Sequence, residues 1–402
     1  MKRDEFYSVI AEDAVADMVA TVSTPAFLYF SQLVRQRHAD LKGCLPSVFQ
    51  IYYAVKANPN SELLRELSTL GVGADVASLG ELTMALATGI DPERIEFSGP
   101  GKSTKELTVA IQRNISSINA ESLLELDIIA QLSRELGIRA NVGVRINPRS
   151  ASDEAGISMS GDTQFGIPLC QLPEALTFIQ AGAGLSFTGL HVHSGSQILS
   201  SSALIENFRV ILDIALETAE LGILPIRKVN FGGGWGITYF SSQVSLNMKH
   251  VAEGLKDVFS NAKYARLSRI RHIVEPGRFL VGECGLYVTR VLYKKLGARK
   301  RFLIVDGGMH QHYLLAGGMG QVIRRNFETD IVAAGPHGEA SPNVYDIAGC
   351  LCTPQDILAT NVLYEREVHV GDRIVFFNSG AYGLTASPMR FLGHELPIEV
   401  VV

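Results

Sequence analysis

Cysteine is scarce in this sequence and has no regular spacing. The chain holds five cysteines among 402 residues, at positions 44, 170, 284, 350 and 352. An odd number without a framework spacing argues against a disulfide-stabilised secreted domain and indicates reduced thiols. The pair Cys350-Leu-Cys352 is too tight for a zinc hook of the CxxC type.

Long apolar runs and blocks of like charge are also absent. No run approaches the length needed to cross a membrane, and the stretch MKRDEFYSVIAEDAV has acidic residues where a signal peptide needs an apolar core. The formal net charge of −5 argues against a nucleic-acid-binding surface, and no charged block offers a binding tail. These absences predict a cytoplasmic protein that binds neither nucleic acid nor a membrane.

What the sequence does contain is a long chain with an alternating pattern. Its 402 residues, 47% hydrophobic with 38 glycines, predict two domains of a soluble enzyme. Between residues 47 and 275, helix-like segments alternate with eight short apolar runs: VFQIYYAV, GADVAS, RIEFSGP, ISSINA, ANVGVRI, SFTGLHVHSG, RKVNFGGG and RHIVEPG. The pattern favours an α/β fold with a (β/α)₈ barrel over residues 29–275, and a doubly wound open sheet is the alternative.

After about residue 276 the pattern becomes rich in strands. The segments FLVGECGLYVTRVLYKK, RFLIVDGG, DRIVFFNSGAYG and LPIEVVV predict a second, mainly β domain resembling a sandwich or barrel. The segment PAFLYF near residue 25 marks the passage into the barrel. Residues 1–28 are therefore expected to join residues 276–402 in the second domain.

A single lysine stands at the end of the first barrel run, in the stretch YYAVKANPN. Its neighbours Ala54, Val55 and Ala57 are apolar, so the local pattern predicts burial. A lysine buried without an anion has a lowered pKa, and its neutral amine is a nucleophile. The alternative is that Lys56 reaches water from a strand terminus.

Three further motifs fall at expected strand ends, which a barrel brings to one mouth. The glycines of FGGGWGI, residues 231–237, suit a turn whose backbone N–H groups bind a phosphate. The alternative is a turn with no ligand. In EPGR, Glu275 could bond a pyridinium nitrogen and Arg278 could bind a phosphate. The alternative is a loop held by a salt bridge. HVHSGSQ puts His191 and His193 on one strand face, where one ring is expected to stack on a flat cofactor and the other to be a core histidine. Because no partner ligands appear, no metal site is predicted.

The stretch GCLCTPQD, residues 349–356, sets a thiol and a carboxylate in a loop of the second domain. Buried cysteines are usually inert packing residues, but a cysteine followed by Thr-Pro in a loop is less typical of a core. Taken together, the strand-end lysine, the glycine turn, a carboxylate for a ring nitrogen and an arginine for a phosphate describe a site for pyridoxal 5′-phosphate (PLP). The lysine would hold PLP as a Schiff base.

The chain resembles the fold-type III, alanine-racemase-like PLP-dependent decarboxylases, which include the diaminopimelate and ornithine decarboxylases. The resemblance covers nearly the whole chain and rests on an ordered set of motifs: YYAVKAN, GADVASLGEL, HVHSGSQ, NFGGGWG, EPGR, CTPQD and GAYG. It implies a PLP-dependent carboxy-lyase. It also implies a head-to-tail homodimer in which the CTPQD loop completes the partner's active site.

The resemblance implies a role for each cofactor-binding residue. Lys56 would carry PLP with Asp75 nearby, His193 would stack on the pyridine ring, and Glu275 would bond the pyridine nitrogen. A carboxylate in that place favours decarboxylation over racemisation. The phosphate ligands would be Ser196, Gly232, Gly233, Gly234, Arg278 and Tyr382.

The substrate side departs from the family pattern. Cys352 would donate the proton to the decarboxylated carbon, with Asp356 beside it, and Tyr382 would also contact the substrate. In relatives a Glu or Asp follows this cysteine, as in CESGD or CDGLD, and binds the distal ammonium of the substrate. Here the residue is Thr353, which cannot neutralise a buried ammonium.

An arginine pair agrees with this departure. The adjacent Arg324 and Arg325 suit a carboxylate or phosphate, or form a solvated surface pair. The loop form CTP-D, with DGGMHQH and GAYGLTASP, is closer to the branch that acts on conjugated amino acids in siderophore, aminoglycoside or exopolysaccharide clusters. We therefore expect decarboxylation of a citryl- or carrier-linked amino acid. The alternatives are a diaminopimelate decarboxylase of lysine biosynthesis and a non-catalytic PLP-binding protein, which is typically a lone barrel.

Overall fold

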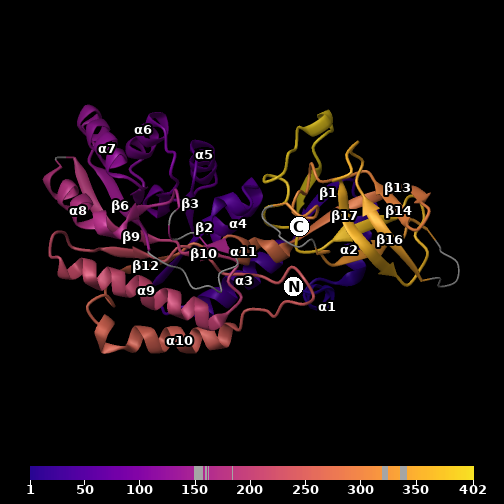
Figure 1. The fold of residues 1–402 in the computed structure, drawn as a ribbon, viewed down its shortest axis with the longest axis horizontal. Coiled ribbons are helices and arrows are strands. Elements are labelled where there is room, and N and C mark those ends of the chain that lie inside the picture. The colour runs from indigo at the N-terminus through magenta and orange to yellow at the C-terminus, as the bar shows by residue number, and fades with distance from the viewer. Residues whose placement is uncertain (149–156, 159–160, 162, 183, 319–324, 336–341) are drawn as a thin grey trace. The chain divides into compact units, whose positions relative to one another are not determined.

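The chain forms two compact units in the computed structural model (Figure 1). The model describes residues 1–402 except 149–156, 159–160, 162, 183, 319–324 and 336–341. The barrel unit comprises Arg35–Gly236 and Leu246–Leu280, and the β unit comprises Met1–Val34, Ile237–Ser245 and Val281–Val402. The boundaries expected from sequence lie a few residues away from these, and the return of 237–245 to the β unit was not predicted.

Eight parallel strands close the barrel. They are β2 (Phe49–Ala54), β3 (Gly73–Val76), β4 (Ile95–Phe97), β5 (Ser117–Ala120), β6 (Ala140–Asn147), β9 (Leu185–Val192), β11 (Lys228–Asn230) and β12 (Arg271–Val274). Their order is β5-β4-β3-β2-β12-β11-β9-β6, and β5 pairs in turn with β6. This last pairing excludes an open sheet and confirms the predicted barrel, with a strand in each of the eight predicted runs.

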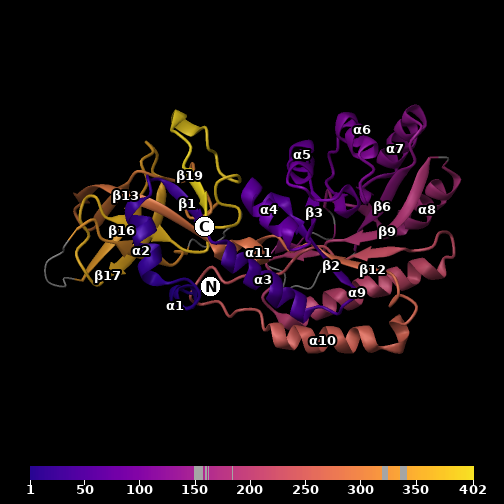
Figure 2. The ribbon, with the colours of Figure 1, turned by 180° about the vertical axis from the view of Figure 1, so that it is seen from behind.

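Helices flank the barrel strands (Figures 1 and 2). They are α3 (Ser31–Cys44), α4 (Ser61–Thr69), α5 (Leu79–Ala87), α6 (Thr104–Gln112), α7 (Leu123–Leu136), α8 (Leu172–Ala181), α9 (Ser201–Glu220), α10 (Met248–Ser260) and α11 (Arg278–Val281). Short side-chain caps fix where several of them begin. Asn60 accepts the N–H groups of the first turn of α4, and Ser103 forms a capping box with Glu106 at α6. The short strands β7 (Ile157–Ser158) and β10 (Gly195–Ser196) pair with each other, and β8 (Ile167–Pro168) extends the edge of β6.

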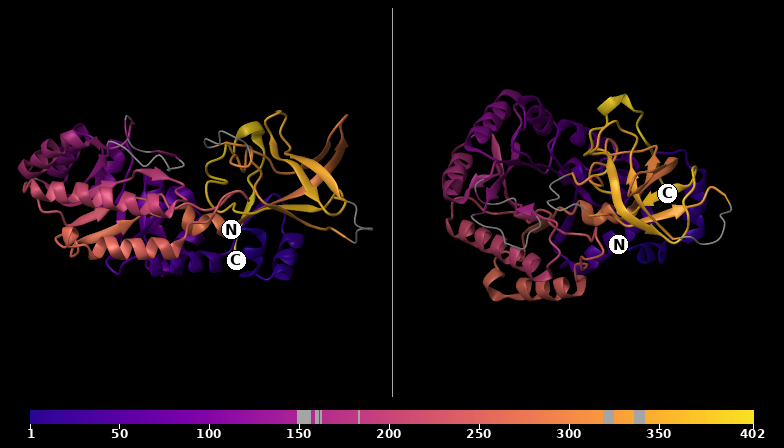
Figure 3. Two further views of the ribbon diagram at one scale, coloured as in Figure 1. Left: turned by 60° about the horizontal axis from the view of Figure 1, so that its bottom comes forward. Right: turned by 45° about the vertical axis from the view of Figure 1, so that its right-hand side comes forward.

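The β unit is built on one sheet (Figure 3). Its strands are β1 (Ala26–Tyr29), β13 (Gly285–Leu296), β14 (Arg301–Val305), β15 (Thr329–Val332), β16 (Asn343–Ala348), β17 (Ile357–Tyr364), β18 (Arg373–Phe376) and β19 (Ile398–Val401), preceded by α1 (Arg3–Tyr7) and α2 (Glu12–Thr21). The first half of β13 pairs with β1 and β18, and the second half pairs with β14 after an irregularity at Val291. Residues 279–284, expected to be strand, are instead α11 and a 3₁₀ turn before β13.

No helix among the described residues combines the length and the apolar character needed to cross a bilayer.

Candidate active site

Lys56 lies just past the end of β2, in the 3₁₀ helix η1 (Val55–Ala57). Its ammonium Nζ is 3.6 Å from Oδ2 of Asp75 on the neighbouring strand β3, where Asp75 pairs in register with Ala54. The Lys56 side chain is 49% exposed, whereas that of Asp75 is 2% exposed. The expectation of a lysine buried without an anion is therefore wrong. The 3₁₀ turn carries Lys56 out of the apolar strand, and Asp75 supplies the anion.

Glu275 follows β12 and is held from two sides. Its Oε2 lies 3.1 Å from Nε2 of His191, and its Oε1 accepts a hydrogen bond from Nδ2 of Asn230 at 2.5 Å. Burial alone would raise the pKa of Glu275. The nearby His191 and Lys56, together with the Asn230 hydrogen bond, outweigh burial and lower this pKa. Glu275 therefore stays ionised at neutral pH.

Asp75 is the second buried carboxyl at this end of the barrel, and its pKa is raised rather than lowered. Burial, together with the negative charge of Glu275, raises the pKa of Asp75 to about 7, while Lys56 opposes the rise. Of two neighbouring carboxyls, Glu275 thus carries a fixed charge and Asp75 exchanges a proton near neutral pH. Such a pair of divergent pKa values is typical of catalytic sites.

A buried polar network lies behind Glu275. Asn230 Nδ2 also donates to Oε2 of Glu96 at 2.9 Å, and Asn119 Nδ2 donates to the same oxygen at 2.9 Å. The ammonium of Lys228 pairs with Oε1 of Glu96, and all of these side chains are buried. Sequence reasoning missed this network. Its signal was present, because each member is a polar residue inside an apolar barrel run.

His193 stands just beyond β9, beside the glycine turn. Its Nδ1 accepts the N–H of Gly233 at 3.0 Å, which assigns the ring proton to Nε2. Burial lowers the pKa of His193 well below its usual value, and the positive charges of Lys56 and Arg145 lower it further. The ring is therefore neutral at pH 7. Its predicted stacking on a pyridine ring stays a prediction.

The glycines after β11 leave no space for side chains. Gly232 and Gly234 have φ values of 64° and 102°, which L-residues rarely adopt. A Cβ on Gly232 would lie 2.6 Å from Nδ1 of His193, and one on Gly233 would lie 2.6 Å from the carbonyl oxygen of Glu275. Glycine is required here because the turn passes directly against the ring of His193 and the backbone carbonyl of Glu275.

The predicted phosphate ligands divide into two groups. Arg278 Nη2 donates to Ser196 Oγ at 3.3 Å, so these two lie together at the start of α11. The N–H of Gly232 donates to Oδ1 of Asn230 at 2.9 Å, and the N–H of Gly233 donates to a histidine. A phosphate would therefore compete with the His193 side chain for the Gly233 amide. Ser196 and Arg278, in contrast, already lie within hydrogen-bond distance of each other.

Two further buried ion pairs of the barrel unit were not predicted. Arg145 Nη1, on β6, is 2.8 Å from Oε1 of Glu121, and the guanidinium lies 4.8 Å from the ring centre of Phe165. Lys102 Nζ is 2.8 Å from Oε1 of Glu125. The arginine inside the apolar run ANVGVRI was the signal that could have indicated the first pair.

The loop residues predicted for the substrate side lie in the β unit. Cys352 is exposed and Thr353 is half-buried. Asp356 is buried, and its carboxylate accepts the N–H groups of Met309 and Leu351 at 2.6 and 2.8 Å. Asp356 thus fastens two loops to each other, and its contact with a substrate stays a prediction.

Tyr382 and the arginine pair complete the predicted set. Tyr382 has φ 54°, a strained backbone conformation of the kind that clusters at functional sites. Arg325 is exposed, donates to Ser242 Oγ at 3.1 Å and lies 5.8 Å from the ring centre of Phe240. Arg324 lies outside the described residues. The substrate-binding roles of these residues stay predictions.

The donor set of the barrel fits PLP. It combines an amine beside an anion, a carboxylate kept ionised for a ring nitrogen, and an arginine with a hydroxyl for a phosphate. The glycine turn packs directly against His193, at a place where a Cβ would clash with the ring.

Comparison with known proteins agrees with this geometry. A family described as "Pyridoxal-dependent decarboxylase, pyridoxal binding domain" matches residues 31–282. The chain is 35% identical to the L-glutamyl-[BtrI acyl-carrier protein] decarboxylase of Niallia circulans, over 94% of this chain and 88% of the relative. It is 31% identical to the diaminopimelate decarboxylase of Aquifex aeolicus, over 96% and 89%. The crystal structure of diaminopimelate decarboxylase from Helicobacter pylori, complexed with L-lysine, gives a TM-score of 0.85 at 30% identity over 96% of this chain and 94% of that one. The chain belongs to the PLP-dependent decarboxylases of the diaminopimelate and ornithine decarboxylase family, and it is an amino acid decarboxylase.

Proposed function

We propose that this enzyme decarboxylates a conjugated amino acid, carried on a citryl group or a carrier protein, in the cytoplasmic biosynthesis of a siderophore or another secondary metabolite. The observation that carries the proposal is Thr353, which directly follows the loop Cys352. A hydroxyl cannot neutralise the second ammonium of a free diamino acid. An unpaired ammonium in a closed site costs about 3 kcal/mol or more.

The similarity to the Niallia circulans enzyme supports this choice of substrate class. That enzyme is named for a glutamyl group on an acyl-carrier protein, and a glutamyl unit has no second amine. Arg324 and Arg325, if they face the substrate, would add attraction for an anionic tail.

The described residues would divide the chemistry as follows. Bound PLP supplies the electron sink for the loss of CO₂. Glu275, held ionised, would accept a hydrogen bond from the pyridine nitrogen and keep that nitrogen protonated. Asp75 would take a proton from Nζ of Lys56 and so free its amine as a nucleophile, since the Asp75 pKa of about 7 suits this exchange. Cys352 would give its Sγ proton to the α-carbon after CO₂ has left.

We further propose that the enzyme acts as a homodimer in which each Cys352 loop serves the partner's barrel. Mixing Lys56→Ala chains with Cys352→Ala chains, each inactive alone, should then restore partial activity through hybrid dimers. Mass spectrometry of differently tagged chains would establish that subunits exchange. Full exchange without returning activity would exclude a shared site.

The substrate proposal is tested by placing at position 353 either a charged side chain or a neutral one of the same length. The unmodified enzyme should prefer a citryl- or carrier-linked amino acid over free diaminopimelate by roughly a hundredfold in kcat/KM, the equivalent of about 3 kcal/mol. Thr353→Glu should weaken turnover of the conjugate and admit diaminopimelate. Thr353→Gln, of the same length but neutral, should not admit it. A CO₂-release assay measures all three enzymes, and efficient turnover of free diaminopimelate with conjugates ignored would overturn the proposal.

Diaminopimelate decarboxylation is the second candidate. The identity of 31% to the Aquifex aeolicus enzyme and the likeness to a lysine-bound structure favour it. The same assay distinguishes the two candidates.

A further inference from the structure

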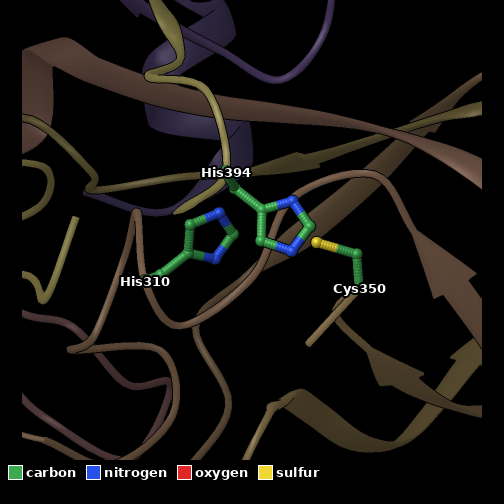
Figure 4. A group of neighbouring side chains, drawn as sticks. All are labelled: His310, Cys350 and His394. Carbon is green, nitrogen blue, oxygen red and sulfur yellow. The ribbon is translucent and has the colours of Figure 1, made fainter. Parts of the chain in front are cut away.

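Three potential metal ligands converge in the β unit, and none of them is among the residues assigned above to PLP. His310, Cys350 and His394 each offer one ligand atom, and these atoms all lie within 4.8 Å of one another. The two imidazole rings have their centres 5.0 Å apart, and Figure 4 shows the Cys350 sulfur beside the His394 ring. No spacing in the sequence joins these residues, because they lie in three separate segments.

The sheet brings two of these segments together. His310 follows β14 and Cys350 follows β16, and these strands are parallel neighbours, so their loops leave the same end of the sheet. The N–H of Cys350 donates to the carbonyl of Gly307 at 3.0 Å, which continues the pairing into the loops. The Asp356 carboxylate, which accepts an amide from each loop, locks them in this arrangement.

The third segment is tied to the first. His394 lies between the 3₁₀ turn Phe391–Gly393 and β19, and the carbonyl of the following Glu395 accepts a hydrogen bond from Nε2 of Gln311 at 3.2 Å. The Gln311 Oε1 in turn accepts the hydroxyl of Tyr287 at 2.6 Å. Hydrogen bonds therefore hold all three ligand-bearing segments before any ion arrives, as a preorganised site requires.

His310 is the second, independent sign of a ligand. Its side chain is fully buried, and among the described residues neither ring nitrogen has a hydrogen-bond partner. An unpaired polar ring in a protein interior calls for an explanation such as an unseen ion.

The nearby His312 is also a buried histidine, but it is not a member of the cluster of potential metal ligands described above. Its ring nitrogens are also buried without a partner among the described residues. However, its ring packs against aromatic neighbours, with centres 5.7 Å from Phe27 and 5.5 Å from Tyr287. The ring of His310 instead faces His394 and a thiol.

The donor types select the ion. Two imidazole nitrogens and one thiolate sulfur form a soft set that suits Zn²⁺, whereas Mg²⁺ and Ca²⁺ require oxygen ligands. Tetrahedral zinc, with bonds of about 2.0–2.3 Å, places its donor atoms about 3.3–3.7 Å apart. The exposed His394 can close the remaining gap and gives the ion a path from solvent.

We propose that His310, Cys350 and His394 form a Zn²⁺ site with a water molecule as the fourth ligand. On binding, the zinc–sulfur bond replaces the S–H bond of Cys350, whose proton passes to the buffer. The ion ties the segment before β19 to the loops after β14 and β16. It also fixes the chain two residues before Cys352, and so steadies the loop that carries the predicted proton donor.

The test uses the PLP-loaded enzyme, dialysed against a chelator and then titrated with Zn²⁺. Elemental analysis after gel filtration should find one zinc per chain. His394→Ala, which alters an exposed residue, and the near-isosteric Cys350→Ser should each weaken zinc binding at least tenfold. The matched controls His250→Ala and Cys170→Ser, at exposed positions elsewhere, should not change it.

A spectroscopic readout separates Cys350 from its neighbour. Loading with Co²⁺ should give a thiolate-to-cobalt charge-transfer band that Cys350→Ser abolishes and Cys352→Ser retains. The proposal is overturned if no stoichiometric zinc binds, if His394→Ala and Cys350→Ser bind zinc like the unmodified enzyme, or if the band follows Cys352 instead.

Discussion

Two sets of buried polar groups, one in each unit, differ in how their hydrogen bonds are satisfied. In the barrel unit, Lys228, Glu96, Asn230 and Glu275 form one continuous chain of ionic and hydrogen-bonded contacts. In the β unit, His310 is equally buried, yet among the described residues both of its ring nitrogens lack a hydrogen-bond partner. The network in the barrel unit thus holds paired charges, whereas His310 in the β unit has ring nitrogens available to a ligand.

The architecture of each unit explains the difference. Parallel barrel strands carry their inward side chains in adjacent layers, so a charged residue on one strand finds partners on its neighbours. His310 lies on a loop beyond the sheet of the β unit, where no neighbouring strand among the described residues supplies a hydrogen-bond partner. The paired network around Glu275 suits PLP, which carries fixed charges. The cluster around the unpaired ring of His310 suits a metal ion.

The largest expected effect comes from breaking the barrel network. Lys228→Met leaves the Glu96 carboxylate buried without a cation, which should lower the free energy of unfolding by about 3–5 kcal/mol. The double variant Lys228→Met/Glu96→Gln removes both charges and should recover much of this loss. The exposed pair Arg209–Glu206 on α9 is the control, and Arg209→Met should cost less than about 1 kcal/mol. Urea denaturation measures all three, and similar losses at the two sites would refute the contrast between paired burial and surface pairing.

The next effect concerns a buried histidine of the barrel unit. His272 is fully buried among aromatic rings, and burial lowers its pKa to about 4. The unfolded chain therefore takes up this proton first, near pH 6.5. The stability that depends on the neutral ring is complete above pH 6.5 and falls by about 3 kcal/mol as the pH drops to 4. His272→Gln should flatten this part of the stability curve.

The control for this pH dependence is the exposed His250 on α10. Denaturant unfolding between pH 4 and 7 should give parallel curves for His250→Gln and the unmodified enzyme. A curve for His272→Gln that remains as steep as theirs would assign the acid sensitivity to other groups.

The smallest expected effect tests the glycine turn. Gly232→Ala forces an L-residue to φ 64° and brings a Cβ against His193, which should cost about 1–2 kcal/mol of cofactor binding, or roughly tenfold in PLP affinity. Gly101→Ala is the control, because nothing lies within 4 Å of a Cβ there. Absorbance titration with PLP measures both, and equal affinities would show that the turn does not shape the site.

The sequence predicted the barrel well because its signal is local. Each buried strand appears in the sequence as a short apolar run, and the predicted cofactor-binding residues lie at or just beyond the ends of these runs. The prediction that Lys56 is buried was wrong because a 3₁₀ turn directly after β2 carries its side chain out of the strand. The pattern of apolar residues does not indicate such a turn. Residues 279–284 were misassigned for a similar reason, since their apolar composition suits both a strand and a buried helix.

The tertiary clusters were beyond local reasoning. Glu96 and Lys228 meet across the barrel interior, although they are far apart in the sequence. His310, Cys350 and His394 meet only because β14 and β16 are adjacent and a later segment returns beside them. Sequence spacing carries no information on such contacts. The expectation of no metal site therefore rested on the tight pair Cys350-Leu-Cys352 and on the lack of further ligands for His191 and His193.

The most direct test of the central claim is to identify the lysine that holds PLP. Borohydride reduction of the yellow holoenzyme fixes the cofactor to that lysine, and peptide mapping by mass spectrometry then locates the label. The barrel unit also contains the buried ammonium groups of Lys102 and Lys228, each of which has a carboxylate partner. We expect a pyridoxyl group on Lys56 alone, and a label on Lys102, Lys228 or any other lysine would exclude Lys56 as the residue that holds PLP.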